Sequence, residues 1–156
     1  MKGNPKVLDA LQEVLKAELT AINQYFVHAE MCENWGYKRL AGLIKKESID
    51  EMKHAEKLIE HILFLDGTPD VSDYFKINIG PTVPKQLEND LEVECAAVER
   101  LNRHIKTCGE TGDAGSRELL EDILTDEEEH VDWLEAQLHA LGEMGIENYL
   151  AEQMKD

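Results

Sequence analysis

The sequence is poor in the residues that mark disorder, secretion and membrane insertion. Its 156 residues include only four Pro, ten Gly and three Cys. The cysteines have no CxxC spacing, so we interpret them as free thiols in a reducing cytoplasm. No apolar run approaches the roughly 20 residues that a membrane span needs, and no secretory signal precedes the amphipathic sequence. We therefore predict one cytoplasmic domain over residues 1–156.

Positive charge is also scarce. Asp and Glu number 33 against 16 Lys and Arg, which gives a formal net charge of −17. Such a chain repels the phosphates of nucleic acids and of anionic lipid surfaces, so we expect neither a nucleic acid nor a membrane as a partner. The same charge attracts cations, which directs attention to metal ions.

Four long segments carry the hydrophobic periodicity of amphipathic helices, with Gly and Pro near their ends. We expect Ser116 to be the N-cap of the fourth segment. The predicted helices span about 5–35, 37–65, 84–109 and 116–142, followed by a short fifth helix over about 146–154.

One connection, from Asp66 to Val83, is long and contains a β-prone stretch at residues 74–79. The second predicted helix is about 42 Å long, and an extended segment of about 17 residues reaches about 56 Å. The connection can therefore run the whole length of a bundle and let the third helix lie parallel to the second. The predicted fold is an all-α, four-helix bundle with one long crossover and a short C-terminal helix.

The two halves of the chain share one pattern. Shifting the sequence by 76 residues aligns leucines and polar residues of the first two predicted helices with those of the last two. The pattern indicates two helical hairpins related by an approximate two-fold axis. The aligned ionisable pairs are Glu18 with Glu94, Glu51 with Glu127, and His54 with His130.

These six ionisable residues fall on the apolar faces of the predicted helices. Burying an unpaired carboxylate costs several kcal/mol, and four of them would consume much of the ~5–15 kcal/mol that keeps a domain folded. Two divalent metal ions would neutralise four carboxylates. Two single Glu plus two Glu-x-x-His motifs form the ligand set of di-iron carboxylate bundles. The predicted metal ligands are Glu18, Glu51, His54, Glu94, Glu127 and His130.

Other interpretations of these residues stay open. Oxygen and imidazole donors suit Fe(II), Mn(II) or Zn(II) and exclude an iron–sulfur cluster. A haem-free di-iron oxidase acting on an organic substrate would use the same ligands. A metal-free structural four-helix module would keep core glutamates protonated and hydrogen-bonded. Tyr25, two turns after Glu18, either packs in the core or serves as a redox relay.

Met52 lies on a second apolar stripe of the second predicted helix. A further stripe on an already amphipathic helix must be covered, so we expect a partner subunit in a two-fold dimer. Facing methionines of such a dimer could bind a haem iron or simply pack. The stripe contains Ile49, Met52, Ile59 and Leu63, and the first helix has a comparable stripe with Leu19 and Phe26.

The chain resembles the bacterioferritin family over essentially its whole length. The resemblance rests on Glu18, Tyr25, Glu94 and the segments 51–54 and 126–130. It implies a hollow shell of twenty-four subunits, each with a ferroxidase centre whose ligands match the six residues above. Two Fe(II) ions are oxidised there by O₂ or H₂O₂, and iron is stored as a ferric mineral. Tyr25 is counted with the catalytic residues.

The resemblance also implies haem b across the subunit dimer, with Met52 of each subunit as axial ligand. This haem carries electrons inward for iron release, often from a ferredoxin. Some members bind a further iron on the cavity wall through one His and two Asp. Asp50 and Asp126 match the two Asp, but Lys46 occupies the His position. Because its ammonium would compete with a cation, we expect this inner site not to work in the same way.

Overall fold

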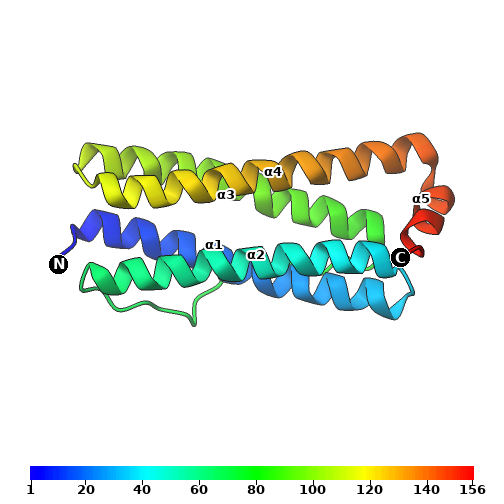
Figure 1. Cartoon of the computed structure of the whole chain (residues 1–156), viewed down its shortest axis with the longest axis horizontal. Helices are drawn as coiled ribbons and strands as arrows, with labels where there is room; N and C mark the ends of the chain where they lie inside the picture. Colours follow the sequence, from blue (N-terminus) through cyan, green and yellow to red (C-terminus); the bar gives the residue numbers. More distant parts are fainter.

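The computed structural model describes residues 1–156 and contains five helices and no strand. Four long helices pack side by side, and a short fifth helix lies across one end of the bundle near the C-terminus (Figure 1). The predicted four-helix bundle with a short C-terminal helix is confirmed. The helices are α1 (Pro5–Asn34), α2 (Lys38–Phe64), α3 (Val83–Glu110), α4 (Ala114–Met144) and α5 (Ile146–Gln153).

The helix ends follow from local capping chemistry. Pro5 begins α1, and the side chain of Asn4 accepts a hydrogen bond from the Lys6 amide. Gly36 has a φ of +89°, a conformation that glycine adopts without strain, and it allows the tight turn into α2. The α1–α2 hairpin is therefore encoded by the residues at its turn.

The predicted N-cap of α4 was wrong. Asp113 is the N-cap, and its side chain accepts the Ser116 amide at 2.9 Å. Ser116 instead lies inside the first turn, because an Asp three residues earlier already caps the helix. At the other end, α4 continues through Gly142 and stops at Gly145, whose φ is +81°.

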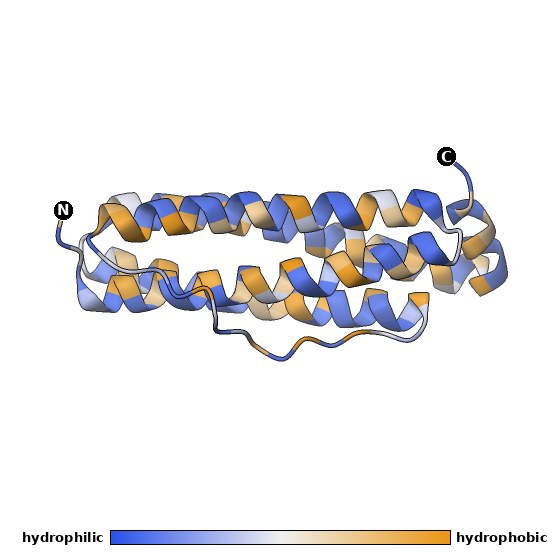
Figure 2. Cartoon of the chain, turned by 90° about the horizontal axis from the view of Figure 1, so that it is seen from below, coloured by the Kyte–Doolittle hydropathy of each residue, from blue (hydrophilic) through white to orange (hydrophobic).

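The chain forms two antiparallel hairpins, α1–α2 and α3–α4, which lie one above the other (Figure 1). The crossover, residues 66–82, runs along the outside of the bundle from one end to the other (Figure 2). It carries the chain back before α3 starts, so α2 and α3 run parallel, as predicted. None of the five helices combines the length and the apolar character needed to span a membrane.

The crossover lies against α1 through side chains spaced four residues apart on one helix face. These side chains accept hydrogen bonds from backbone N–H groups of the extended segment, which has no neighbouring strand. The bonds run from Phe75 N to Thr20 Oγ1 (2.9 Å), from Asn78 N to Gln24 Oε1 (3.0 Å) and from Gly80 N to His28 Nε2 (2.9 Å).

Two apolar clusters fill the two ends of the bundle. One includes Leu15 of α1 and Leu58 of α2; the other includes Tyr25 of α1 and Ile44 of α2. On both helices a buried Glu stands between the two clusters, Glu18 on α1 and Glu51 on α2. The fold thus leaves a polar layer in the middle of an apolar core.

Candidate metal centre

Each of the four long helices contributes one buried glutamate near its middle. Buried apolar residues lie on the same face within two turns before and after each Glu, so the helical period carries the carboxylate inward with them. Even the most exposed of the four, Glu18, has only 2% of its surface accessible. The four residues are Glu18 on α1, Glu51 on α2, Glu94 on α3 and Glu127 on α4.

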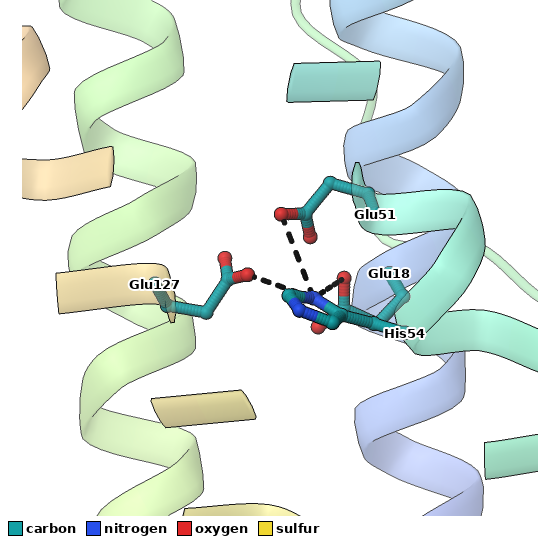
Figure 3. Close-up of side chains that lie close together, drawn as sticks. All are labelled: Glu18, Glu51, His54 and Glu127. Carbon is teal, nitrogen blue, oxygen red and sulfur yellow. Dashed lines mark ion pairs between the residues drawn. The ribbon is translucent and has the colours of Figure 1, made fainter. Parts of the chain in front are cut away.

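His54 completes a first group of ligand atoms. It lies one turn after Glu51, and its ring points into the bundle between the carboxylates (Figure 3). The distance from His54 Nδ1 is 3.1 Å to Glu127 Oε1, 3.6 Å to Glu18 Oε2 and 3.8 Å to Glu51 Oε1. One atom from each of these four residues lies within 4.8 Å of the others, which is close enough for one metal ion to bind them all.

His130 completes a second group of the same kind. Its Nδ1 lies 3.2 Å from Glu51 Oε1, 3.7 Å from Glu94 Oε1 and 3.9 Å from Glu127 Oε1. One oxygen or nitrogen atom from each of these four residues (Glu51, Glu94, Glu127 and His130) lies within 4.8 Å of the others. Glu51 and Glu127 belong to both groups, so the arrangement offers two adjacent metal positions with two shared carboxylates. The structure therefore brings all six predicted ligands together.

The six side chains are poorly satisfied by protein groups alone. Each has a buried oxygen or nitrogen atom that makes no hydrogen bond of proper geometry, although both histidines form ion pairs with the glutamates. Such an atom costs about 1–3 kcal/mol or more when charged. The helices thus present unpaired electron-donor atoms toward one another. The atoms are Glu18 Oε2, Glu51 Oε1, His54 Nδ1, Glu94 Oε2, Glu127 Oε1 and His130 Nδ1.

Burial and mutual repulsion shift the protonation of these groups. Burial first, and then the neighbouring carboxylates, raise the pKa of Glu51, Glu94 and Glu127 well above the usual value. Burial lowers the pKa of His54 and His130, but adjacent carboxylates outweigh it and raise both pKa values overall. Without metal, the centre therefore holds protons that a bound cation would displace.

A polar pocket opens over the centre between α2 and α4. It has a volume of about 450 Å³, and most residues that line it are charged. Both histidines line the pocket, so the centre is connected to the outside through their rings. Lining residues next to the histidines include Glu47, Asp50 and Asp126.

Two contacts on the outer side of the histidine rings were not predicted from the sequence. His54 Nε2 lies 2.7 Å from Asp126 Oδ2, and His130 Nε2 lies 3.9 Å from Asp50 Oδ2. Each contact joins residues of different helices. The available signal was an Asp directly before each Glu-x-x-His motif, but only the packing of α2 against α4 shows which Asp meets which His.

The chain is similar in sequence to known proteins of one family. The family model of the ferritin-like domain matches residues 8–144. The chain is 47% identical over 152 residues to the bacterioferritin of Mycobacterium leprae (strain TN), an alignment that covers 97% of this chain and 96% of that protein. The chain belongs to the bacterioferritin family.

Further relatives are similar over at least 90% of their length. A bacterial ferritin of Synechocystis sp. (strain ATCC 27184 / PCC 6803 / Kazusa) is 44% identical over 155 residues, which is 99% of each protein. The bacterioferritin of Streptomyces coelicolor is 44% identical over 151 residues, 97% of this chain and 90% of that protein. The resemblance inferred from the motifs is thus confirmed for nearly the complete chain.

Tyr25, which the bacterioferritin resemblance groups with the catalytic residues, is fully buried in the apolar cluster that includes Ile44. Its hydroxyl donates a hydrogen bond to Glu94 Oε1. Burial, followed by the charge of Glu94, raises the pKa of Tyr25 well above its usual value. Tyr25 is therefore both a core residue and a direct neighbour of a predicted ligand; its role as a redox relay stays a prediction.

Met52, the predicted haem ligand of a bacterioferritin dimer, does not join the six residues of the centre. It lies on the outside of α2, where 43% of its surface is accessible. Ile59 and Leu19 of the predicted stripes pack partly against the core, whereas Ile49 and Leu63 on α2 and Phe26 on α1 are exposed. These side chains have the exposure that a dimer contact requires.

Lys46, the residue that departs from the bacterioferritin pattern for an inner iron site, contacts one of the two matching acids. Its Nζ lies 3.1 Å from Asp50 Oδ2. The two residues are four apart on α2, a spacing that favours ion pairs on a helix. As expected, the Lys46 ammonium therefore forms an ion pair with one of the two acids that the further iron would bind. The effect of this ion pair on iron binding stays a prediction.

Proposed function

We propose that this chain stores iron and oxidises Fe(II) to Fe(III) at a di-iron centre within each subunit. Membership in the bacterioferritin family supports iron storage. The observation that carries the ferroxidase activity is the set of six side chains from four helices that converge with unpartnered donor atoms. The proposed ligands are Glu18, Glu51, His54, Glu94, Glu127 and His130.

The charge at the centre supports two divalent ions. Four carboxylates carry four negative charges when ionised, and the lysines that line the pocket over the centre are exposed side chains. Two Fe(II) ions supply four positive charges and would satisfy every unpartnered atom. Carboxylate oxygens are hard ligands that favour the higher charge of Fe(III), so the same residues hold both oxidation states.

Bound iron supplies one electron per ion, so two ions reduce O₂ together with two protons to H₂O₂, or H₂O₂ together with two protons to water. Glu51 and Glu127, which belong to both groups of ligand atoms, would hold the two ions side by side. They also keep the reacting atoms in a largely buried site, where unproductive reactions with bulk solvent are reduced. The pocket between α2 and α4 gives Fe(II) and oxidant access to the centre.

The proposal extends to an assembly and to haem b. The exposed stripe around Met52 would be covered by a second copy of the chain, and two such methionines would bind the iron of one haem between them. Haem bound there would supply a path for electrons during iron release, with a ferredoxin as reductant. The shell would contain twenty-four copies, in agreement with the family resemblance, and would hold the ferric mineral.

Fe(II) oxidation under air tests the proposed centre. We expect Glu94→Ala and His130→Ala to abolish the rapid phase of oxidation, because each change removes one metal ligand, while the shell still assembles. Glu128→Gln is the matched control, since it changes an exposed acid next to Glu127. Rapid oxidation in the ligand variants at the normal rate would contradict the assignment.

The alternatives differ in measurable ways. A di-iron oxidase for an organic substrate needs an apolar substrate pocket, whereas the pocket over this centre is mostly charged. Only a storage protein needs a shell, so size-exclusion chromatography separates these two functions. A purely structural module would retain no iron after loading with Fe(II), and iron analysis of the loaded protein would show it.

A further inference from the structure

We infer that the two metal positions are unequal, with the position at His54 binding a divalent metal more tightly than the position at His130. The main cause is Lys46, which is not itself a ligand but forms an ion pair with Asp50, the carboxylate that would otherwise hold the His130 ring. This inference rests on the proposed function, because it concerns the affinities of the same centre.

The two histidine rings are held differently on their outer side. His54 Nε2 lies within hydrogen-bond distance of Asp126, at 2.7 Å, whereas His130 Nε2 lies 3.9 Å from Asp50, too far for a hydrogen bond. A carboxylate that accepts the outer N–H of a histidine fixes the ring and its tautomer, and leaves Nδ1 as a metal ligand. The His54 ring is therefore oriented in advance, and the His130 ring is not.

Lys46 accounts for the difference between the two aspartates. Its ammonium lies 3.1 Å from Asp50 Oδ2, the same oxygen that faces His130. The oxygen thus bonds the lysine rather than the histidine. Asp126 has no such competitor, since no basic side chain forms an ion pair with it other than His54.

The internal repeat of the chain shows that this difference is encoded locally. A shift of 76 residues aligns Asp50 with Asp126 and Lys46 with Asp122. Asp122 is acidic and exposed, so it cannot bond Asp126 as Lys46 bonds Asp50. One lysine therefore breaks the approximate two-fold symmetry of the centre.

The ligands themselves add to the inequality. Glu51 and Glu127 belong to both positions and cannot distinguish them. Of the two unshared glutamates, Glu94 accepts a hydrogen bond from Tyr25, whereas Glu18 contacts only His54 among the basic residues. A metal at the His130 position must therefore share Glu94 with the tyrosine hydroxyl.

Titration of the metal-free, full-length protein with Co(II) tests the inequality, because the visible absorption of bound Co(II) reports each position without any turnover. In competition with a chelator, we expect Co(II) to bind in two steps. The affinity of the first step should be at least about 10-fold higher than that of the second, which is the low end of the effect of an outer carboxylate on metal affinity. His130→Ala should keep the tight step and His54→Ala should lose it. Two steps of equal affinity, or the reverse assignment, would overturn the inference.

Lys46→Met tests the cause, because it removes the ammonium group and keeps an unbranched side chain of nearly the same length. We expect it to free Asp50 for His130 and to tighten the second step by about 10-fold, with little change in the first. Lys45→Met is the matched control, because Lys45 is exposed and forms no ion pair with Asp50. Equal shifts in both variants would show a general charge effect and overturn the role of Lys46. No Co(II) binding at all would instead contradict the proposed centre itself.

Discussion

Glu47 shows how burial changes a single carboxylate beside the proposed ligands. It lies one turn before Glu51 on α2, is 7% exposed and has a buried oxygen without a hydrogen-bond partner. Burial raises its pKa from 4.5 to about 8, although the charge of His130 opposes the shift. At neutral pH this residue therefore holds a proton in the folded protein that it loses in the unfolded chain.

The pH dependence of stability follows from that difference. Because the folded pKa of Glu47 is raised, its contribution to stability is present below about pH 4.5 and is lost as the pH rises toward 8. We expect Glu47→Gln to raise the unfolding free energy of the metal-free protein at pH 8, on the order of a few kcal/mol, with little change at pH 4.5. Urea denaturation at both pH values measures it, with Glu128→Gln as control. An equal effect at both pH values would contradict the shifted pKa.

At the scale of elements, the crossover depends on close backbone packing as well as on the side chains of α1. A Cβ atom on Gly80 would lie 2.5 Å from the Gln86 amide nitrogen at the start of α3, a distance that real Cβ atoms do not reach. Gln86 also donates to the Gly80 carbonyl oxygen at 3.0 Å. The end of the crossover and the first turn of α3 therefore form one packed unit.

We expect Gly80→Ala to destabilise the protein by about 1–3 kcal/mol, the usual cost of overpacking, and to increase cleavage of the crossover by a protease. Gly42→Ala is the matched control, because nothing lies within 4 Å of its added Cβ and α2 should tolerate it. Thermal unfolding and limited proteolysis measure the two effects. Equal unfolding temperatures and equal cleavage rates in the two variants would show that the close packing at Gly80 does not contribute to stability.

At the scale of the whole molecule, the exposed stripe around Met52 is the surface at which we propose that a second copy of the chain binds. We expect Met52→Leu to give a folded, assembled protein without haem, because Leu covers the same apolar area but has no thioether ligand. The haem Soret band and size-exclusion chromatography measure the two properties. Met154→Leu, an exposed methionine at the C-terminus, is the control. A Soret band of full intensity in the Met52 variant would exclude Met52 as the ligand.

The net charge of −17 acts on the whole molecule as well. A strongly negative protein raises the local concentration of cations, and salt screens this field over about 10 Å at 0.1 M ionic strength. We expect the initial rate of Fe(II) oxidation at limiting iron to fall as NaCl increases, whereas the rate at saturating iron stays nearly constant. If the rate at limiting iron does not depend on salt, the negative charge of the protein plays no part in iron capture.

Much of the candidate site was predictable because a helix places residues on its faces by a fixed period. The positions of Glu18, Glu51, Glu94 and Glu127 among leucines were sufficient to predict that they converge. Capping was less predictable, since Asp113 and Ser116 both have side chains that can cap α4 and only the structure distinguishes them. Contacts across helices, such as His54 with Asp126, depend on distances that no sequence period contains.

The amino-acid sequence by itself determined the four helices, the length of the crossover, the excess of negative charge and the six residues that face inward, because all of these follow from local periodicity and composition. The tertiary structure decided which carboxylates are shared by the two proposed metal positions and which aspartate each histidine ring meets. It also decided that Lys46 bonds Asp50 on the side facing His130. The physical reason is that the packing of α2 against α4 sets these distances, and a small difference in distance decides whether a hydrogen bond forms.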